Sequence, residues 1–243
     1  MAGNSAFILM SNSWFRFKQF NVEQDRCSMK VGTDGVLLGA WFPLVGGCRV
    51  LDIGTGTGLV ALMAAQRGAG RVRAVEIDPD AAAQAASNAA ASPWADVIDV
   101  RCSDIAAFNP DARYDRIVCN PPYFRDSLRC PDTGRNTARH NDALSYETLA
   151  SCSAAMLADD GMVCLVLPFD SVPDFSRCVA ACGLDMCQRV DVVTAHGKSP
   201  KRSLVAYSKS AGPLSVSVLE MCGANGNETP DYISLVKDFY LKY

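Results

Sequence analysis

Residues 48–68, CRVLDIGTGTGLVALMAAQRG, decide the fold. The apolar run at the start of this segment is typical of a buried strand, and the run that ends at Gly68 is typical of a helix. Between the two runs, Gly54, Gly56 and Gly58 let the backbone turn sharply and let a ligand lie against it. The N-terminus of the following helix adds amide donors and a positive dipole end. We therefore predict a strand–loop–helix unit that binds a ligand, with a plain tight turn as the alternative.

The spacing of the glycines narrows the kind of ligand. It is Gly-x-Gly-x-Gly, whereas dinucleotide-binding folds use Gly-x-Gly-x-x-Gly. The loop contains no lysine, so a cradle for a triphosphate is not indicated.

Strand-like and helical runs alternate outward from this unit as far as residue 209. Such alternation predicts an α/β fold with a parallel, doubly wound sheet and helices on both faces. Because no helix separates the last two strands, we expect them to form an antiparallel hairpin at the end of the sheet. The seven predicted strands are 48–53, 72–77, 96–102, 114–119, 162–168, 185–195 and 202–209. The predicted helices are 59–68, 79–91, 145–158 and 170–182.

Two shorter segments flank this core, which spans residues 48–209. Residues 1–47 are predicted to form a cap with a strand-like run at 15–22 and a short helix at 33–41. Residues 210–243 are predicted to form an extension with a helix at 232–240. No repeat or low-complexity linker interrupts the chain, so we expect residues 1–243 to form one domain.

The composition is that of a cytoplasmic protein. The 243 residues are 49% hydrophobic and 20% charged, with no signal-peptide pattern and no apolar run that could cross a bilayer. The eleven cysteines show no Cys-x-x-Cys spacing, so we interpret them as reduced, with Cys178, Cys182 and Cys187 on a buried helix face. Two histidines make a metal site unexpected. The net charge of −3 means that any nucleic-acid contact would come from a local basic patch.

Carboxylates recur at the ends of the predicted strands. Asp52 precedes the glycine loop, Glu76 closes the second strand, and Asp104 follows the third. Glu76 is placed to hold a ribose with two free hydroxyls, and Asp104 to accept a hydrogen bond from an adenine amine. Asp78 is the alternative to Glu76, although we favour Asp78 as the N-cap of the helix that begins with Pro79.

The fourth strand ends in CNPPYF, residues 119–124. Proline cannot donate to a strand ladder, so the strand stops there and leaves Asn120 extended. The side-chain oxygen of Asn120 and the backbone carbonyl of Pro121 can accept both N–H groups of one planar nitrogen, whose lone pair is otherwise delocalised. Tyr123 can stack on the flat group, while Phe124 either closes the other face or belongs to the core. An adenine amine and a glutamine amide both fit this pattern.

In this order, the motifs resemble those of class I S-adenosylmethionine-dependent methyltransferases, over most of residues 30–209. The resemblance implies a Rossmann-like fold and methylation of a planar nitrogen. It places Asp52 and the glycine loop beside the methionine part of the cofactor, Glu76 at the ribose and Asp104 at the adenine. The catalytic residues that it implies are Asn120, Pro121 and Tyr123.

The segments before the core carry a closer resemblance. FRFKQF at 15–20 and KVGTDGVLLGAW at 30–41, together with PKR at 200–202, resemble the bacterial tRNA1(Val) adenine-N6 methyltransferases. This family modifies the adenine beside the anticodon, adenine 37, so tRNA is the implied substrate. Lys30, Thr33 and Asp34 would then lie against the carboxylate end of the cofactor and the target pocket. A helix start capped by Thr33 or Asp34 is the other interpretation of these two residues. The full set of implied cofactor-binding residues is Lys30, Thr33, Asp34, Asp52, Gly54, Gly56, Gly58, Glu76, Asp104 and Asn120.

Two other functions fit parts of the sequence. Glutamine methyltransferases that act on release factors resemble this core, but they carry a sizeable helical domain before the glycine loop. An RNA-binding protein with an inactive methyltransferase fold is the non-enzymatic alternative.

Three basic segments are candidates for contact with RNA: the loop after NPPY, residues 196–202, and a pair of cations flanked by aromatic residues that can stack on bases. We expect all three around one mouth, because loops at the carboxyl ends of strands share the ligand side of a sheet. An ordinary solvated loop is the alternative for each. The candidate residues are Arg16, Lys18, Arg125, Arg129, Arg135, Arg139, His140, Lys198, Lys201 and Arg202. We expect the protein to be a monomer.

Overall fold

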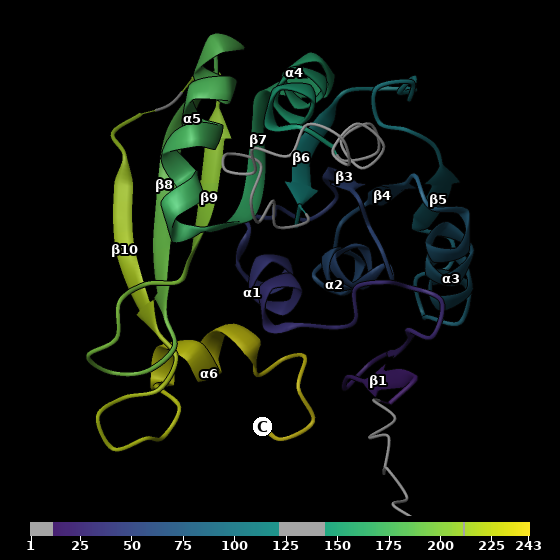
Figure 1. Ribbon diagram of the computed structural model, residues 1–243. Coiled ribbons are helices and arrows are strands. Elements are labelled where there is room, and N and C mark those ends of the chain that lie inside the picture. Colours follow the sequence, from purple (N-terminus) through teal and green to yellow (C-terminus); the bar gives the residue numbers. More distant parts are fainter. Residues whose placement is uncertain (1–11, 122–143, 211) are drawn as a thin grey trace, which may run out of the picture.

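The computed structural model describes residues 12–121, 144–210 and 212–243 (Figure 1). In this part of the chain, a sheet of eight strands has the order β10-β8-β9-β7-β6-β3-β4-β5. Only β9 runs antiparallel to its neighbours, and every other pairing is parallel. The strands are β3 (Arg49–Ile53), β4 (Arg71–Glu76), β5 (Ile98–Cys102), β6 (Tyr114–Cys119), β7 (Leu157–Pro168), β8 (Asp185–Val193), β9 (Arg202–Ser208) and β10 (Ser215–Glu220).

Helices cover both faces of this sheet, and each face has its own apolar core. Successive residues of a strand point to opposite faces, so Val50 of β3 lies in one core and Leu51 in the other. This two-sided burial explains why the central strands read as continuous apolar runs in the sequence. The helices are α1 (Thr33–Trp41), α2 (Leu59–Gln66), α3 (Pro79–Ala90), α4 (Tyr146–Met156), α5 (Val172–Ala181) and α6 (Pro230–Val236), with a short 3₁₀ turn η1 (Phe169–Ser171).

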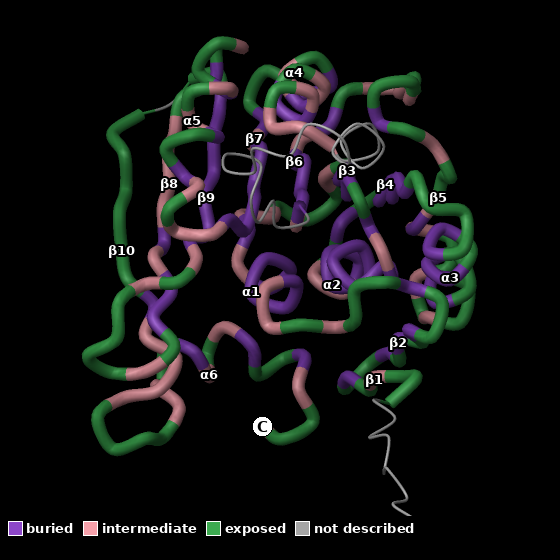
Figure 2. The backbone as a smooth tube through the Cα atoms, in the orientation of Figure 1, coloured by how far each residue is buried: buried purple, intermediate pink, exposed green. Residues whose placement is uncertain are grey.

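All seven predicted strands are present, and the predicted antiparallel pairing of the last two is confirmed as β8 with β9. The prediction was incomplete at the end of the sheet. An eighth strand, β10, comes from the C-terminal extension and pairs in parallel with β8, so β8 does not end the sheet. The antiparallel strand β9 lies between β8 and β7, and the expectation of an antiparallel strand at the end of the sheet was wrong. The sequence of β10, SVSVLE, lacks an apolar run because most of the strand is exposed, and Figure 2 shows it green along the sheet edge.

The N-terminal cap differs from the single strand-like run that we expected. A turn in which the Phe17 N–H donates to the carbonyl of Phe20 (2.9 Å) separates two short antiparallel strands, β1 (Trp14–Arg16) and β2 (Asn21–Glu23). Phe17 and Phe20 are both buried and stack on each other, and Phe17 also stacks on Tyr240 from the C-terminal segment. The aromatic residues of the hairpin turn therefore hold the two ends of the chain together.

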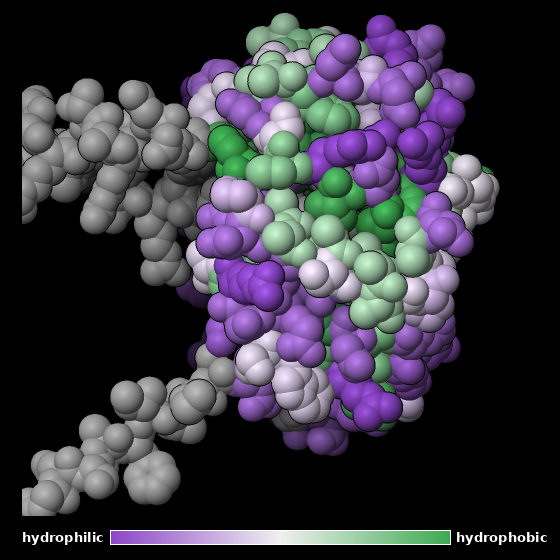
Figure 3. Space-filling view, turned by 90° about the vertical axis from the view of Figure 1, so that its right-hand side faces the viewer, coloured by the Kyte–Doolittle hydropathy of each residue, from purple (hydrophilic) through white to green (hydrophobic). Residues whose placement is uncertain are grey.

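The opposite edge of the sheet carries β5 and α3. On this side, hydrophobic side chains gather in the central and upper part of the surface, with hydrophilic ones around them (Figure 3). None of the helices among the described residues combines the length and the apolarity needed to cross a membrane.

Candidate active site

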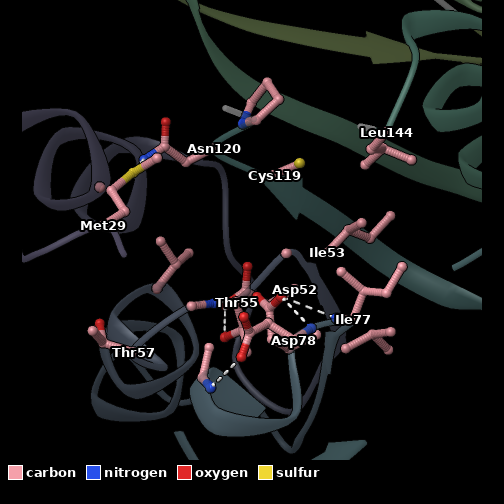
Figure 4. Close-up of a pocket in the computed structure, with 18 of the residues that line it drawn as sticks. Met29, Asp52, Ile53, Thr55, Thr57, Ile77, Asp78, Cys119, Asn120 and Leu144 are labelled. Carbon is pink, nitrogen blue, oxygen red and sulfur yellow. Dashed lines mark hydrogen bonds between the residues drawn. The ribbon is translucent and has the colours of Figure 1, made fainter. Parts of the chain in front are cut away.

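A cavity of about 920 Å³ lies at the carboxyl ends of β3, β4 and β6, beside the first turn of α1 and the start of α4 (Figure 4). Parallel strands bring their carboxyl ends to one edge of a sheet, so residues from distant parts of the sequence meet there. The sequence-predicted residues in the wall of this cavity are Lys30, Thr33, Asp34, Asp52, Gly54, Gly56, Glu76, Asp104, Asn120, Pro121 and Arg202.

The glycine loop presents bare backbone to the cavity. Gly54 and Gly56 have φ angles of 67° and 54°, in the left-handed region that favours glycine. A Cβ atom added at either position would meet nothing within 4 Å, so the space in front of this backbone is open to a ligand. Gly58 does not line the cavity. It forms the N-cap of α2, where an added Cβ would lie 3.4 Å from Ala85 of α3.

Asp52 holds the glycine loop to the start of α2 through hydrogen bonds. Its Oδ2 atom accepts hydrogen bonds from the Thr55 hydroxyl (2.6 Å) and from the N–H of Ala61 (3.1 Å), and the residue is 1% exposed. Burial raises the pKa of Asp52 to about 7, against the opposing effect of these hydrogen bonds, and the charge of Glu76 adds to the increase.

Glu76 joins the loop to the end of β4. One carboxylate oxygen accepts from the N–H of Gly56 (2.9 Å), and the other accepts from the N–H groups of Ile77 (2.9 Å) and Asp78 (3.1 Å). Asp78 caps α3 by accepting from the N–H groups of Asp80 and Ala81, which confirms the predicted N-cap. Both acids line the cavity, so which of them binds a ribose stays a prediction.

Asp104 completes the acidic side of the cavity. It follows β5, and its Oδ1 atom accepts from the N–H of Ala106 (2.9 Å). The three strand-end carboxylates, Asp52, Glu76 and Asp104, thus lie in one wall, in the order of β3, β4 and β5 in the sheet.

Asn120 directly follows β6, which lies beside β3 on the side away from β4 and β5. Its Nδ2 atom lies 3.9 Å from Sδ of Met29, and Figure 4 shows the thioether pointing at the amide. A Cβ atom added to Gly35 of α1 would also lie 3.9 Å from this nitrogen. The cap is therefore in contact with the residue that ends β6, and no motif in the sequence indicated Met29 as part of the wall. Pro121 is described, whereas Tyr123 and Phe124 lie outside the described residues.

The first turn of α1 carries Thr33 and Asp34. The interpretation of these residues as helix caps was wrong, because Gly32 is the N-cap and no side chain caps the helix. Asp34 instead lies 2.5 Å, Oδ1 to Nε, from Arg202 at the start of β9. Burial raises the pKa of Asp34, and the charge of Arg202 acts against this increase.

The candidate RNA-binding residues lie in different settings. Lys198 and Lys201 are exposed in the turn between β8 and β9, whereas Arg202 is half-buried in the wall of the cavity. Arg16 and Lys18 are exposed on the β1–β2 hairpin, and Lys18 donates to the carbonyl of Lys237 (2.7 Å). Their neighbours Phe17 and Phe20 are core residues, so the expectation that these rings stack on bases was wrong. The hairpin packs through Phe20 on Trp94, which lies between the end of α3 and the start of β5, so the expectation that this segment shares the mouth of the cavity was wrong. The candidates of the loop after NPPY, Arg125, Arg129, Arg135, Arg139 and His140, lie outside the described residues.

Comparisons with known proteins agree with this geometry. Residues 33–166 match the family model of the methyltransferase small domain. The chain is 48% identical over 236 residues to a tRNA1(Val) (adenine(37)-N6)-methyltransferase of Bacteroides fragilis (strain YCH46), which covers 96% of this chain and 100% of the relative. A protein of the same description from Yersinia pseudotuberculosis serotype O:3 (strain YPIII) is 45% identical, over 94% of this chain and 92% of its own.

Among solved structures, the fold resembles that of a predicted O-methyltransferase, Atu636 of Agrobacterium tumefaciens. The TM-score is 0.64 at 19% identity, over 85% of this chain and 96% of the other. The Rossmann-like methyltransferase fold that the sequence predicted is thereby confirmed. By its fold and by its full-length relatives, the chain belongs to the family of tRNA1(Val) (adenine(37)-N6)-methyltransferases.

Proposed function

We propose that this protein methylates the N6 amine of adenine 37 in the anticodon loop of tRNA1(Val), with S-adenosylmethionine as the methyl donor. The observation that carries the proposal is the shared cavity, in which Asn120 and Pro121 at the end of β6 face the same space as the glycine loop and the strand-end carboxylates. The relatives that match this chain over nearly their full length are named for that activity. Residues 1–243 act together as one domain.

The wall on the β3, β4 and β5 side fits the cofactor. The bare backbone at Gly54 and Gly56 leaves room for the methionine part, with Lys30 and Thr33 at its carboxylate end. Glu76 accepts hydrogen bonds from the ribose hydroxyls, and Asp104 accepts one from the adenine amine. When bound, S-adenosylmethionine supplies a methyl group that its sulfonium already activates.

The residues at the end of β6 prepare the target nitrogen. The adenine amine is a poor nucleophile because its lone pair is delocalised into the ring. With Nδ2 of Asn120 beside the sulfur of Met29, the amide oxygen is the atom left to accept one N–H of the target, and the carbonyl of Pro121 accepts the other. Gripped in this way, the nitrogen becomes pyramidal, with its lone pair available for attack. No general base is needed before transfer, because the proton becomes acidic once the nitrogen is alkylated.

The substrate reaches the cavity from the side of the β8–β9 turn, where Arg202 lies in the wall. Lys198 and Lys201 contact the phosphates of the stem-loop, as do Arg16 and Lys18 on the hairpin, and Tyr123 stacks on the target base. Adenine 37 lies in a loop, so flipping it out requires less energy than flipping a base from a duplex. The protein acts as a monomer in the cytoplasm. The cysteines of the described residues form no disulfides, which agrees with a reducing compartment.

The test is methyl transfer from labelled S-adenosylmethionine to unmodified tRNA1(Val), followed by nucleoside analysis. We expect label in N6-methyladenosine, and none when adenine 37 is replaced by guanine. The matched control is Gly56→Arg, which fills the open space in front of the loop and should abolish cofactor binding in calorimetry. Label in a release-factor glutamine instead would identify the glutamine methyltransferase. Binding of both ligands without transfer would identify an RNA-binding protein.

A further inference from the structure

Arg202 and Asp34 form an ion pair inside the cavity wall. The side chains are 24% and 14% exposed, and Nε of Arg202 lies 2.5 Å from Oδ1 of Asp34. Arg202 opens β9 and Asp34 belongs to the first turn of α1, so the pair joins two segments from nearly opposite ends of the chain. Both residues line the cavity that holds Asn120.

The order of the strands places this pair on the target side of the cavity. Arg202 is paired with Pro168 at the end of β7, and β7 lies next to β6, which leads into Asn120. The carboxylates assigned to the cofactor belong to β3, β4 and β5, on the other side of β6. Asp34 is also followed by Gly35, the residue whose added Cβ would lie 3.9 Å from the Asn120 amide.

The charges of the wall differ between the two sides. The carboxylates of Asp52, Glu76, Asp78 and Asp104 lie along the cofactor side. Among the described residues of the wall, the cations are Lys30 and Arg202. A nucleotide that enters beside Asn120 brings a negatively charged phosphodiester with it, and Arg202 is a cation in that part of the wall.

A partly buried ion pair of this kind is not expected to add much to the stability of the fold. Desolvation of two charges commonly outweighs their attraction, and apolar residues of similar volume often serve a fold as well. Burial raises the pKa of Asp34 even with Arg202 beside it, so the attraction does not fully offset desolvation here. The atom of Arg202 that lies against Asp34 is Nε, and a guanidinium has two terminal nitrogens besides Nε with which it can make a bidentate contact.

We propose that Arg202 binds a phosphodiester oxygen of the target nucleotide when adenine 37 enters the cavity, and that Asp34 is a positioning residue that orients the guanidinium through Nε. This inference rests on the proposed function and deepens it, since it moves one RNA contact from the exposed turn into the cavity. The recognition is of phosphate, so it acts on the nucleotide that is methylated whatever its base.

The first test replaces Arg202 by methionine, which keeps much of the side-chain volume and removes the charge. We expect the KM for tRNA to rise roughly ten- to hundredfold, as for loss of a charged hydrogen bond. The slope of log affinity against log salt concentration should fall by about 0.7, the value for one contact with a single-stranded phosphate. The Kd for S-adenosylmethionine should stay unchanged in calorimetry. Lys209→Met is the matched control, because Lys209 follows β9 at its other end and pairs with Asp159 far from the cavity.

Two further variants separate contact from positioning. Asp34→Asn keeps the cation and removes its partner, so the KM for tRNA should rise by less than in Arg202→Met while the salt slope stays unchanged. Arg202→Lys keeps the charge and the ion pair but loses the planar fork, so it should also keep the slope and raise KM. If Arg202→Met fails to fold, the lysine variant still tests the proposal, because an unchanged KM for tRNA would overturn it.

The possible outcomes separate a failure of this inference from a failure of the proposed function. Wild-type protein that does not methylate adenine 37 contradicts the proposed function itself. A second outcome is that the wild type methylates adenine 37, while Arg202→Met binds the cofactor more weakly and keeps the wild-type salt slope for tRNA. This outcome would assign Arg202 to the cofactor carboxylate, and it would overturn the inference but not the proposed function. A lower melting temperature with both affinities unchanged would make the pair structural and would overturn it too.

Discussion

The two sides of the cavity are built in different ways. On the cofactor side, polar contacts link residues at most 20 positions apart, such as the Thr55 hydroxyl with Asp52 and the Gly56 N–H with Glu76. On the target side, Met29 meets Asn120, which is 91 positions away, and Asp34 meets Arg202, which is farther still. The first side depends on local motifs and the second on how α1 packs against the sheet. The two sides should therefore respond separately to mutation, one in cofactor affinity and the other in turnover.

The strongest test of this separation is Asn120→Ala. The substitution removes one of the two acceptors for the target amine, so we expect kcat to fall by about 10²–10³-fold, as for loss of one preorganised partner of the reacting group. Cofactor affinity should not change, because the carboxylates on the other side are untouched. Steady-state kinetics with tRNA and calorimetry with S-adenosylmethionine measure the two effects. Asn109→Ala, at an exposed asparagine, is the control. A parallel loss of cofactor affinity would show that the sides are not separable.

The complementary test is Glu76→Gln. It keeps the shape of the side chain but removes the charge and places an amide N–H₂ among the N–H groups of Gly56, Ile77 and Asp78. We expect the cofactor Kd to rise roughly ten- to hundredfold, with a smaller change in kcat at saturating cofactor.

Asp78→Asn is the matched control for Glu76→Gln, since asparagine caps a helix about as well as aspartate. It should leave cofactor affinity unchanged. The reverse result, a weaker cofactor in Asp78→Asn alone, would make Asp78 the ribose ligand.

The difference between locally built and long-range contacts also explains which features could be predicted from the sequence. The glycine loop, the carboxylates at the strand ends and the Asp78 cap were all predictable, because each depends on residues within a few positions of one another. The seven strands were predictable because their burial on both faces requires apolar runs.

The features that were missed depend on distant residues or on exposure. Thr33 and Asp34 have the residue types of a cap, but Arg202 engages Asp34 and no side chain caps α1. In the sequence Phe17 and Phe20 look available for stacking on bases, but both are buried, with Tyr240 stacked on Phe17 and Trp94 against Phe20. No local pattern encodes these contacts, since each partner lies far away in the sequence.

Asn88 links the N-terminal hairpin to the glycine loop, and its removal tests how far the cap contributes to stability. Buried in α3, it donates to the carbonyls of Glu23 and Thr57 (both 2.9 Å) and accepts from the N–H of Glu23 (2.9 Å). Asn88→Ala leaves these buried groups unsatisfied, so the free energy of unfolding should fall by about 1–3 kcal/mol. The melting temperature should fall by about 2–4 °C for each kcal/mol.

Ser87→Ala is the control for Asn88→Ala, because the Ser87 hydroxyl is exposed and bonds only within its own helix. Its melting temperature should stay close to that of the wild type. An equally stable Asn88→Ala variant would mean that the hairpin is held by its aromatic contacts alone.

The last expected effect is a change in how stability depends on pH. The pKa of Asp52 rises from 3.8 in the unfolded chain to about 7 in the folded one, so between these values the folded chain binds more protons at this site. The contribution of Asp52 to the free energy of unfolding therefore decreases as the pH rises from about 4 to 7, and is constant above that range. Asp52→Asn removes this decrease, so its melting temperature should fall less than that of the wild type between pH 4 and pH 8.

Asp170→Asn, at an exposed aspartate, is the control and should keep the wild-type dependence. The charge of Glu76 contributes to the raised pKa, so Glu76→Gln should shift the decrease in stability to lower pH without abolishing it. If Asp52→Asn keeps the wild-type dependence, Asp52 is ionised with an ordinary pKa. The glycine loop would then lie beside a full negative charge at Asp52, in place of a carboxylate that titrates near neutral pH.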